Sequence, residues 1–163
     1  MRGKAIELIT LVAQSRAEIR AHGVSILLGA YTWNLKTGKP AEIATIAIAT
    51  KDGASVAEAG VIARALYTAR DLIHTPANIK TPLWMAQEAK KIAEEKGLAI
   101  SILAGKELAQ FGGLRAVGNS SPKPGPRFIE ITYIPKGKAR SAAALPHVVI
   151  VGKGITFDTG GIS

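Results

Sequence analysis

The chain alternates short runs rich in β-branched residues with longer segments of helical periodicity, and glycine or proline ends most of them. This alternation constrains the fold more than any other feature, because strands separated by helices normally build a parallel sheet covered by helices. We therefore predict an α/β fold with a mostly parallel sheet and flanking helices. The expected helices are residues 4–22, 55–72 and 82–96, and the expected strands are residues 43–49, 98–103, 128–134 and 147–151.

Local signals set the expected helix ends. Gly23 is expected to end the first helix, and Ser55 followed by Glu58 has the spacing of a capping box that opens the second. Thr81 before a proline is expected to cap the third helix, which Gly97 ends.

Four further segments complete the secondary-structure prediction. Residues 24–28 are either a short strand or a further helical turn, and residues 31–40 read as a surface loop. Residues 107–111 are expected to form a short helix that ends at the following glycine pair. Residues 147–151 are the strongest candidate for a buried strand, because four of the five are β-branched.

Composition excludes several classes of protein. A chain of 163 residues with 47% hydrophobic and 20% charged residues is typical of one folded domain or two small ones. The absence of cysteine excludes disulfides, thiol catalysis and thiolate metal sites. The apolar runs are far shorter than the roughly 18 residues of a membrane span, and we find no targeting segment. We therefore expect a cytoplasmic protein with no membrane partner.

The net charge of +9 is concentrated in part of the chain. Residues 115–153 hold seven basic residues against one acidic residue, Glu130. Such a stretch would attract nucleic acid or an anionic surface. We favour a solvated face as the explanation, because the charges are scattered and no aromatic residues interleave them.

Residues 148–163, VVIVGKGITFDTGGIS, carry the strongest chemical signal. Lys153 follows an apolar run and lies between two glycines, and Asp158 comes five residues later. A lysine leaving an apolar strand is a candidate for a lowered pKa, and a neutral amine beside a carboxylate can bind a divalent cation. The spacing of a phosphate-binding loop is not met, and the glycines are also compatible with a simple turn at a strand end.

This segment resembles the signature of the leucyl aminopeptidase family, which are cytosolic dinuclear metallopeptidases. Three further segments support the resemblance, and in order and spacing they cover nearly the whole chain. Residues 69–78, ARDLIHTPAN, followed by Thr81, are similar to the start of that family's catalytic domain. Residues 27–33, LLGAYTW, resemble the end of its smaller N-terminal domain, and residues 118–121 before Pro126 give a weaker match.

The resemblance implies a peptidase with two divalent cations, usually zinc, with manganese or magnesium exchangeable. It assigns Lys153 to one metal and Asp158 to both metals as a shared ligand. A carboxylate can bridge a metal pair about 3.5 to 4 Å apart, which agrees with this assignment. The implied substrates are peptides with a free N-terminus, and the implied assembly of an intact member is a hexamer.

In the family, a second lysine, further acidic ligands and an arginine follow the signature segment. We therefore expect this chain to be an incomplete member, inactive by itself. Residues 1–54 would be the C-terminal part of the N-terminal domain, residues 55–80 a linker helix and junction, and residues 81–163 the first part of the catalytic domain. The alternative is a non-enzymatic fragment that binds nucleic acid through residues 115–153.

The other candidates have structural interpretations. His74 is read as a structural residue before Pro76, and His22 as a favourable charge at a helix C-terminus. His147 opens the last strand and has no partner histidine at metal spacing. Serine catalysis is not expected, because Ser120 and the following serine lack the surrounding glycines. The two tryptophans, Trp33 and Trp84, are read as packing anchors.

Overall fold

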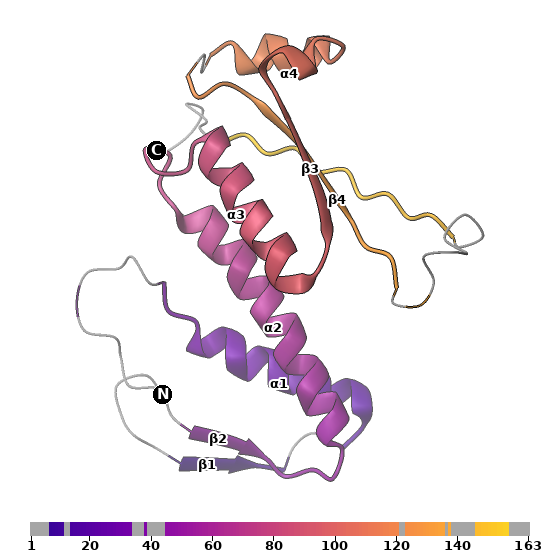
Figure 1. Cartoon of the computed structure of the whole chain (residues 1–163). Helices are drawn as coiled ribbons and strands as arrows, with labels where there is room; N and C mark the ends of the chain where they lie inside the picture. Colours follow the sequence, from indigo (N-terminus) through magenta and orange to yellow (C-terminus); the bar gives the residue numbers. More distant parts are fainter. Residues whose placement is uncertain are drawn as a thin grey trace. The chain divides into compact units, whose positions relative to one another are not determined.

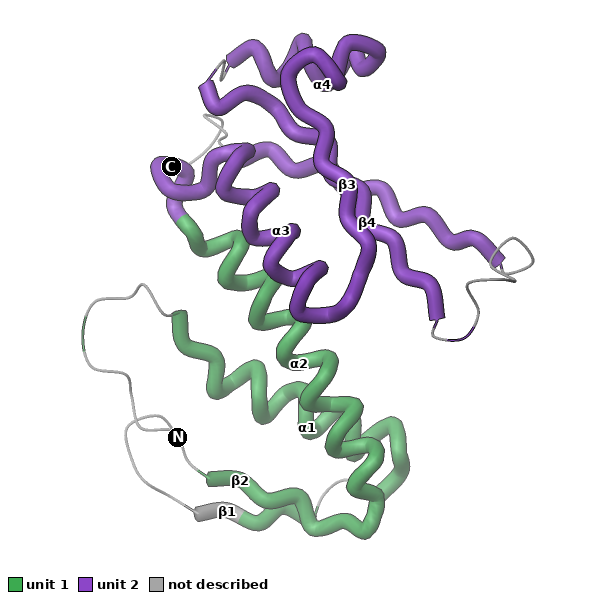
Figure 2. Tube along the Cα trace, viewed as in Figure 1, with its two compact units in different colours: residues 1–75 green, residues 76–163 purple. Residues whose placement is uncertain are grey.

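The computed structural model describes residues 7–11, 14–33, 38, 45–120, 123–135, 137 and 146–156. The chain forms two compact units, residues 1–75 and residues 76–163 (Figure 2). Both units combine helices with a two-stranded sheet, so the predicted α/β class is confirmed. One strand pair is parallel and the other is antiparallel.

The first unit has the order β1 (Glu7–Thr10), α1 (Arg16–Ala30), β2 (Thr45–Ile48) and α2 (Gly53–His74) (Figure 1). The strands β1 and β2 pair in parallel, with Glu7 opposite Thr45 and Thr10 opposite Ile48. The helix α1 packs against both β2 and α2.

The start of the first unit corrects the predicted helix over residues 4–22. Residues 7–10 form β1, and α1 begins at Arg16. Ser15 caps α1: its side chain accepts the Glu18 N–H at 3.3 Å, and the Glu18 carboxylate accepts the Ser15 N–H at 3.0 Å. This reciprocal pair fixes the helix start. The residues before it pair with a strand that lies far away in the sequence.

Gly23 lies inside α1 and does not end it, so that prediction is wrong. The helix continues to Ala30 and includes residues 24–28, for which a helical turn was one of the two readings. Gly23 is buried, and a Cβ placed on it would lie 2.8 Å from the Ala59 Cβ of α2. Because glycine has no side chain, α1 and α2 can approach closely at this position. Ile19, Ala59 and Ala63 are the buried apolar residues beside it.

The start of α2 also differs from the prediction. Asp52, three residues before Ser55, is the N-cap, and its carboxylate accepts the Ser55 N–H at 3.1 Å and the Ser55 hydroxyl at 2.7 Å. Ser55 is a buried residue of the first turn, and Glu58 pairs with Arg20 of α1 at 3.3 Å. Because Asp52 supplies a stronger cap earlier in the chain, the helix begins there.

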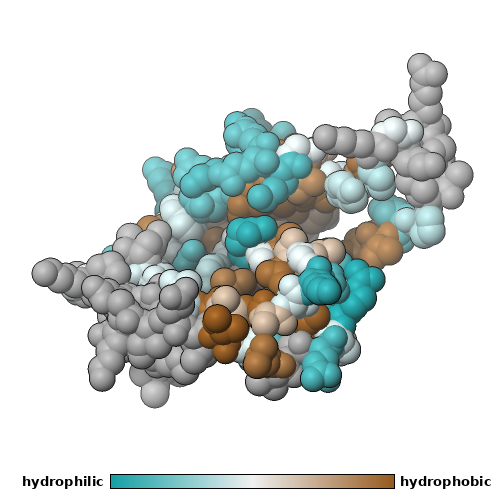
Figure 3. All heavy atoms as spheres, turned by 90° about the horizontal axis from the view of Figure 1, so that it is seen from below, coloured by the Kyte–Doolittle hydropathy of each residue, from teal (hydrophilic) through white to brown (hydrophobic). Residues whose placement is uncertain are grey.

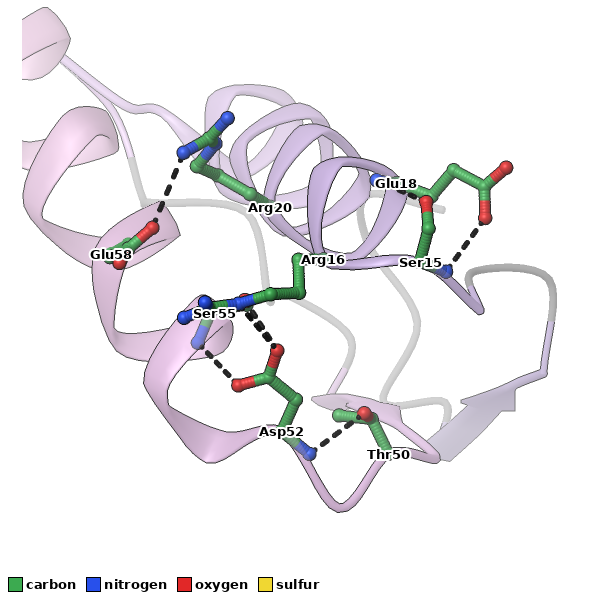
Figure 4. A network of polar contacts seen from close by, with 8 residues as sticks. All are labelled: Ser15, Arg16, Glu18, Arg20, Thr50, Asp52, Ser55 and Glu58. Atoms are coloured by element: carbon green, nitrogen blue, oxygen red, sulfur yellow. Dashed lines mark hydrogen bonds and ion pairs between the residues drawn. The ribbon is translucent and has the colours of Figure 1, made fainter.

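Polar contacts join the N-terminal halves of α1 and α2 (Figure 4). The Nε of Arg16 lies 3.4 Å from Oδ2 of Asp52. The two hydrogen bonds from Ser55 hold the pKa of Asp52 below its ordinary value, and the Arg16 charge adds to this. The carboxylate of Asp52 thus caps one helix and pairs with the other. As predicted, α2 ends before Pro76, with Thr75 as its C-cap.

The second unit has the order α3 (Pro82–Lys96), β3 (Ala99–Ala104), the 3-10 turn η1 (Gly105–Leu108), α4 (Gly112–Gly118) and β4 (Arg127–Thr132). The predicted caps of α3 are confirmed. The Thr81 hydroxyl accepts the Trp84 N–H at 3.2 Å, and Gly97 takes the left-handed conformation with φ of 65°. That conformation has no steric cost for glycine.

The strands β3 and β4 pair antiparallel and confirm two predicted strands to within a few residues. Ile100 lies opposite Ile131 and Ile102 opposite Ile129, and α3 packs against both strands. On the other face, the Phe128 ring stacks on Phe111 at 5.0 Å between centroids. Leu108 of η1 is the largest fully buried side chain among the described residues.

Two predictions in the second unit are wrong. The expected helix over residues 107–111 is instead the turn η1, and the glycine pair begins α4 where an end was expected. Residues 147–151 are described but form no strand, and all five are exposed. A strand requires a hydrogen-bonded neighbour, and no described strand pairs with this segment.

Many apolar side chains remain on the surface. Figure 3 shows apolar residues at the surface among polar ones. The exposed apolar residues of the first unit include Ile9, Leu11, Val61 and Ile73. No helix in the described ranges is long and apolar enough to cross a membrane.

The close approach of α1 and α2 gives a stability test with a matched control. Gly23→Ala is expected to destabilise the first unit by about 1 to 3 kcal/mol, because the new methyl group would clash with Ala59. Gly29→Ala, in the same helix, meets no described atom within 4 Å and should stabilise by up to about 1 kcal/mol. Urea unfolding can be followed by Trp33 fluorescence in a Trp84→Phe background. Equal effects of the two substitutions would contradict the close approach.

Candidate functional site

The two predicted metal ligands are not brought together in the described part of the chain. Lys153 lies in residues 146–156 and is exposed, whereas Asp158 lies outside the described residues. A Cβ placed on Gly152 or Gly154 meets no described atom within 4 Å, so neither glycine marks a close approach here. The metal assignment of Lys153 and Asp158 stays a prediction.

Whether the described residues can bind a metal ion depends on how many ligand side chains lie together. Within the described ranges, no group of three His, Asp or Glu residues could hold a metal ion. A catalytic cation typically takes about three protein ligands, and Lys153 is one donor. The described residues alone therefore do not form the dinuclear site that the sequence resemblance implies.

The basic stretch at residues 115–153 does not form an open row of cations among its described members. The Arg127 guanidinium donates to the carbonyl oxygens of Pro124, Gly125 and Pro126 at 2.7, 3.1 and 2.9 Å. Arg115 donates to the Ala109 carbonyl at 3.5 Å. These two guanidinium groups thus stabilise their own loops.

A polar and aromatic cluster that the sequence analysis missed ties the end of α1 to the end of α2. The Tyr31 hydroxyl donates to Oδ1 of Asp71 at 2.6 Å. Burial, together with the hydrogen bond and charge of Asp71, raises the pKa of Tyr31 to about 12. The phenol therefore stays protonated and keeps its hydrogen bond throughout the neutral range.

Two residues of α2 bind the carbonyl groups at the end of α1. The Tyr67 hydroxyl donates to the Leu27 carbonyl, and Nη1 of Arg70 donates to the Leu28 carbonyl at 3.2 Å. The Arg70 guanidinium also lies 5.3 Å from the Tyr31 ring centroid. The last carbonyls of a helix have no partner within the helix, so these side chains complete its C-terminal end.

His74 belongs to this cluster and has a structural role, as predicted. Its Nδ1 lies 2.8 Å from the Arg70 carbonyl oxygen and 3.4 Å from the Tyr31 hydroxyl. Because a carbonyl oxygen only accepts, Nδ1 is the nitrogen that carries the hydrogen. The imidazole also stacks on the Tyr31 ring at 5.8 Å between centroids, and the Trp33 ring lies tilted against it at 5.9 Å. The sequence signal for the cluster is the pair Tyr31 and Trp33, which come just after the observed end of α1.

The remaining candidates take ordinary structural positions. His22 lies in the middle of α1, not at its C-terminus, and its Nε2 lies 3.0 Å from the buried Thr10 hydroxyl. The Ser120 hydroxyl donates to the Val117 carbonyl at 3.0 Å. His147 is exposed and opens no strand. Trp33 Nε1 is buried and makes no hydrogen bond to the described part of the chain.

Comparison with known proteins shows which family this chain belongs to. Residues 67–163 match the model of the cytosol aminopeptidase family, catalytic domain. That match covers more than half of the chain and includes the segment with Lys153 and Asp158. The chain belongs to the cytosol aminopeptidase family, as its sequence resemblance predicted.

Two curated relatives show the extent of the match. A probable cytosol aminopeptidase of Aquifex aeolicus is 33% identical, and the match covers 100% of this chain and 34% of that protein. A probable cytosol aminopeptidase of Mycobacterium ulcerans is 40% identical over 73% of this chain and 23% of that protein. The chain thus spans about a third or less of the relatives that it matches.

Solved structures share the fold. The bottromycin maturation enzyme BotP in complex with Mn superposes with a TM-score of 0.70 and 30% identity, over 82% of this chain and 30% of that one. The apo leucyl aminopeptidase of Trypanosoma cruzi gives a TM-score of 0.68 over 85% of this chain and 28% of that one. At 24% identity, the second likeness concerns the fold alone.

The Tyr31 contact gives a pH-dependent prediction. Its folded pKa of about 12 exceeds the ordinary value of 10.0, so folding favours the neutral phenol. The stabilisation is complete below pH 10 and is lost as the pH rises toward 12. Tyr31→Phe should cost about 1 kcal/mol at neutral pH, and its difference from wild type should shrink between pH 10 and 12. Thermal unfolding measures this, with the exposed Tyr133→Phe as control. A constant difference across that pH range would contradict the assignment.

Proposed function

We propose that this chain supplies two metal ligands, Lys153 and Asp158, to a dinuclear cytosol aminopeptidase. The observation that carries the proposal is the match of residues 67–163 to the family's catalytic domain, which includes Gly152-Lys153-Gly154 and Asp158. In the whole protein, two zinc or manganese ions would be held at this site. The manganese present in the BotP structure supports a divalent cation in this fold.

The reaction proposed for the whole protein is the removal of an N-terminal residue from a peptide. The metal pair would supply an activated water and polarise the peptide carbonyl. Lys153 would hold one cation through its amine nitrogen, and Asp158 would hold both cations through its carboxylate. These two roles need an amine nitrogen and a carboxylate, which lysine and aspartate provide.

The domain boundaries, partners and location that we propose also rest on the family membership. We place residues 1–54 in the N-terminal domain, residues 55–80 in a linker helix and junction, and residues 81–163 in the catalytic domain. The proposed partners are peptides with a free N-terminus and, for the intact protein, five further copies in a hexamer. The proposed location is the cytoplasm, in agreement with the names of the curated relatives. The relatives and the family match lend no support to nucleic-acid binding.

A chimera tests the two ligands. This chain can replace the matching third of the Aquifex aeolicus relative, and leucine amide hydrolysis and bound metal are then measured. Lys153→Met should remove one metal and Asp158→Asn both, with activity falling more than about 100-fold, since even outer-shell changes cost about 10 to 100-fold. Lys91→Met and Glu95→Gln, which alter exposed residues of α3, are the matched controls. Full occupancy of two metals in dialysed Asp158→Asn would contradict the proposal.

The 163-residue chain alone is expected to be inactive. It offers Lys153 and Asp158, whereas each catalytic cation needs about three protein ligands and an open position. No hydrolysis of a chromogenic leucine substrate is expected after loading with zinc or manganese. If turnover scales with the chain concentration and disappears in Asp158→Ala, the proposed need for further ligands is wrong.

A further inference from the structure

Three consecutive carbonyl groups in the loop before β4 converge on one nitrogen atom. Nη1 of Arg127 donates to the carbonyl oxygens of Pro124, Gly125 and Pro126 at 2.7, 3.1 and 2.9 Å. An Nη group of arginine carries two hydrogens, so the three oxygens share them. The oxygens are therefore arranged around a point of positive charge, and not along the planar fork by which a guanidinium binds a carboxylate.

The backbone of this loop is fixed by features that do not involve the guanidinium. The rings of Pro124 and Pro126 restrict their φ angles, and Gly125 between them has φ of 69°, which has little steric cost for glycine. The Pro126 ring packs directly on Gly118 at the end of α4, where an added Cβ would overlap it. Gly125 is buried and both prolines are half-buried. The three carbonyl oxygens should therefore keep their places when the Arg127 head group is removed.

The spacing of the three oxygens selects the kind of cation that they can bind. Oxygen ligands lie about 2.3 to 2.6 Å from Ca²⁺ and about 2.0 to 2.1 Å from Mg²⁺. The distances from the three oxygens to Nη1 are longer, from 2.7 to 3.1 Å, and are typical of an N–H donor. Backbone carbonyl oxygens carry no net charge and replace the water shell of potassium in ion channels. An ammonium ion, or a potassium ion of similar size, fits this spacing.

We propose that the carbonyl groups of residues 124–126 form a binding site for a monovalent cation, and that the Arg127 guanidinium is its built-in occupant. Arg127 supplies the positive charge that the converging carbonyl dipoles attract, so the loop needs no dissolved ion. Because Arg127 is also the first residue of β4, opposite Ala104 of β3, the occupied site fixes the start of that strand. When the guanidinium is removed, a potassium or ammonium ion binds in its place.

Thermal unfolding of a variant without the guanidinium tests this site. In a Trp33→Phe background, Trp84 fluorescence reports the second unit, because Trp84 lies in α3, which packs against β3 and β4. In lithium chloride, Arg127→Met should lower the Tm by about 4 to 8 °C, as expected for the loss of one net hydrogen-bonded contact. Potassium or ammonium chloride at the same ionic strength should restore at least about half of this loss, because only the folded state binds the ion. The wild type should have nearly the same Tm in all three salts.

Two further variants are the controls. Arg115→Met removes a guanidinium with a single bond at 3.5 Å, and its Tm should not depend on the salt. Arg127→Lys places an ammonium group with three hydrogens near the same oxygens, so it should keep most of the wild-type Tm in every salt. Equal Tm values of Arg127→Met in the three salts would overturn the proposal, as would the same salt dependence in Arg115→Met. If Arg127→Met folds in none of the salts, Arg127→Lys decides: a folded lysine variant supports the site, and an unfolded one overturns it.

Discussion

The packing of α1 against α2 is the interaction on which the first unit depends. Gly23 lets the helices approach at their centre, where Ala59 and Ile19 are also buried. Polar contacts then hold both ends, through the Arg16 pair with Asp52 near the start and the Tyr31 bond to Asp71 near the finish. The apolar contact is small, because glycine and alanine bury little area. The polar contacts at the two ends add to this packing.

The second unit contains Lys153, one of the two proposed metal ligands. Its antiparallel strands contact η1, in which Leu108 is fully buried, but the segment that leads to Lys153 lies exposed and unpaired among the described residues. A metal site built from two residues in one segment needs ligands from elsewhere before it can hold two cations. The family match covers this unit, yet the chain spans about a third or less of its relatives. Family membership is thus established by sequence and fold, while the catalytic assignment rests on the chemistry of Lys153 and Asp158.

The fold was largely predictable where contacts between residues close in the sequence determine it. The Thr81 cap, the Gly97 end of α3 and the strands β3 and β4 were all predicted. Errors occurred where two local signals competed. Asp52 caps α2 in place of Ser55, because the aspartate accepts both the Ser55 N–H and its hydroxyl. For the candidate site, the sequence supplied residue types and family. It missed the Tyr31 cluster, because Tyr31 and Asp71 are 40 positions apart.

The sequence by itself determined the α/β class, both ends of α3 and the family, since these depend on residues close together in the chain. Tertiary structure decided three features that no local pattern contains. Residues 7–10 form a strand because β2 lies beside them, and Gly23 continues a helix because α2 approaches it there. Residues 147–151 have a strong strand composition but remain unpaired in the described structure. In each case the physical reason is the same: pairing and close packing need a partner from a distant part of the chain, and the local sequence does not specify that partner.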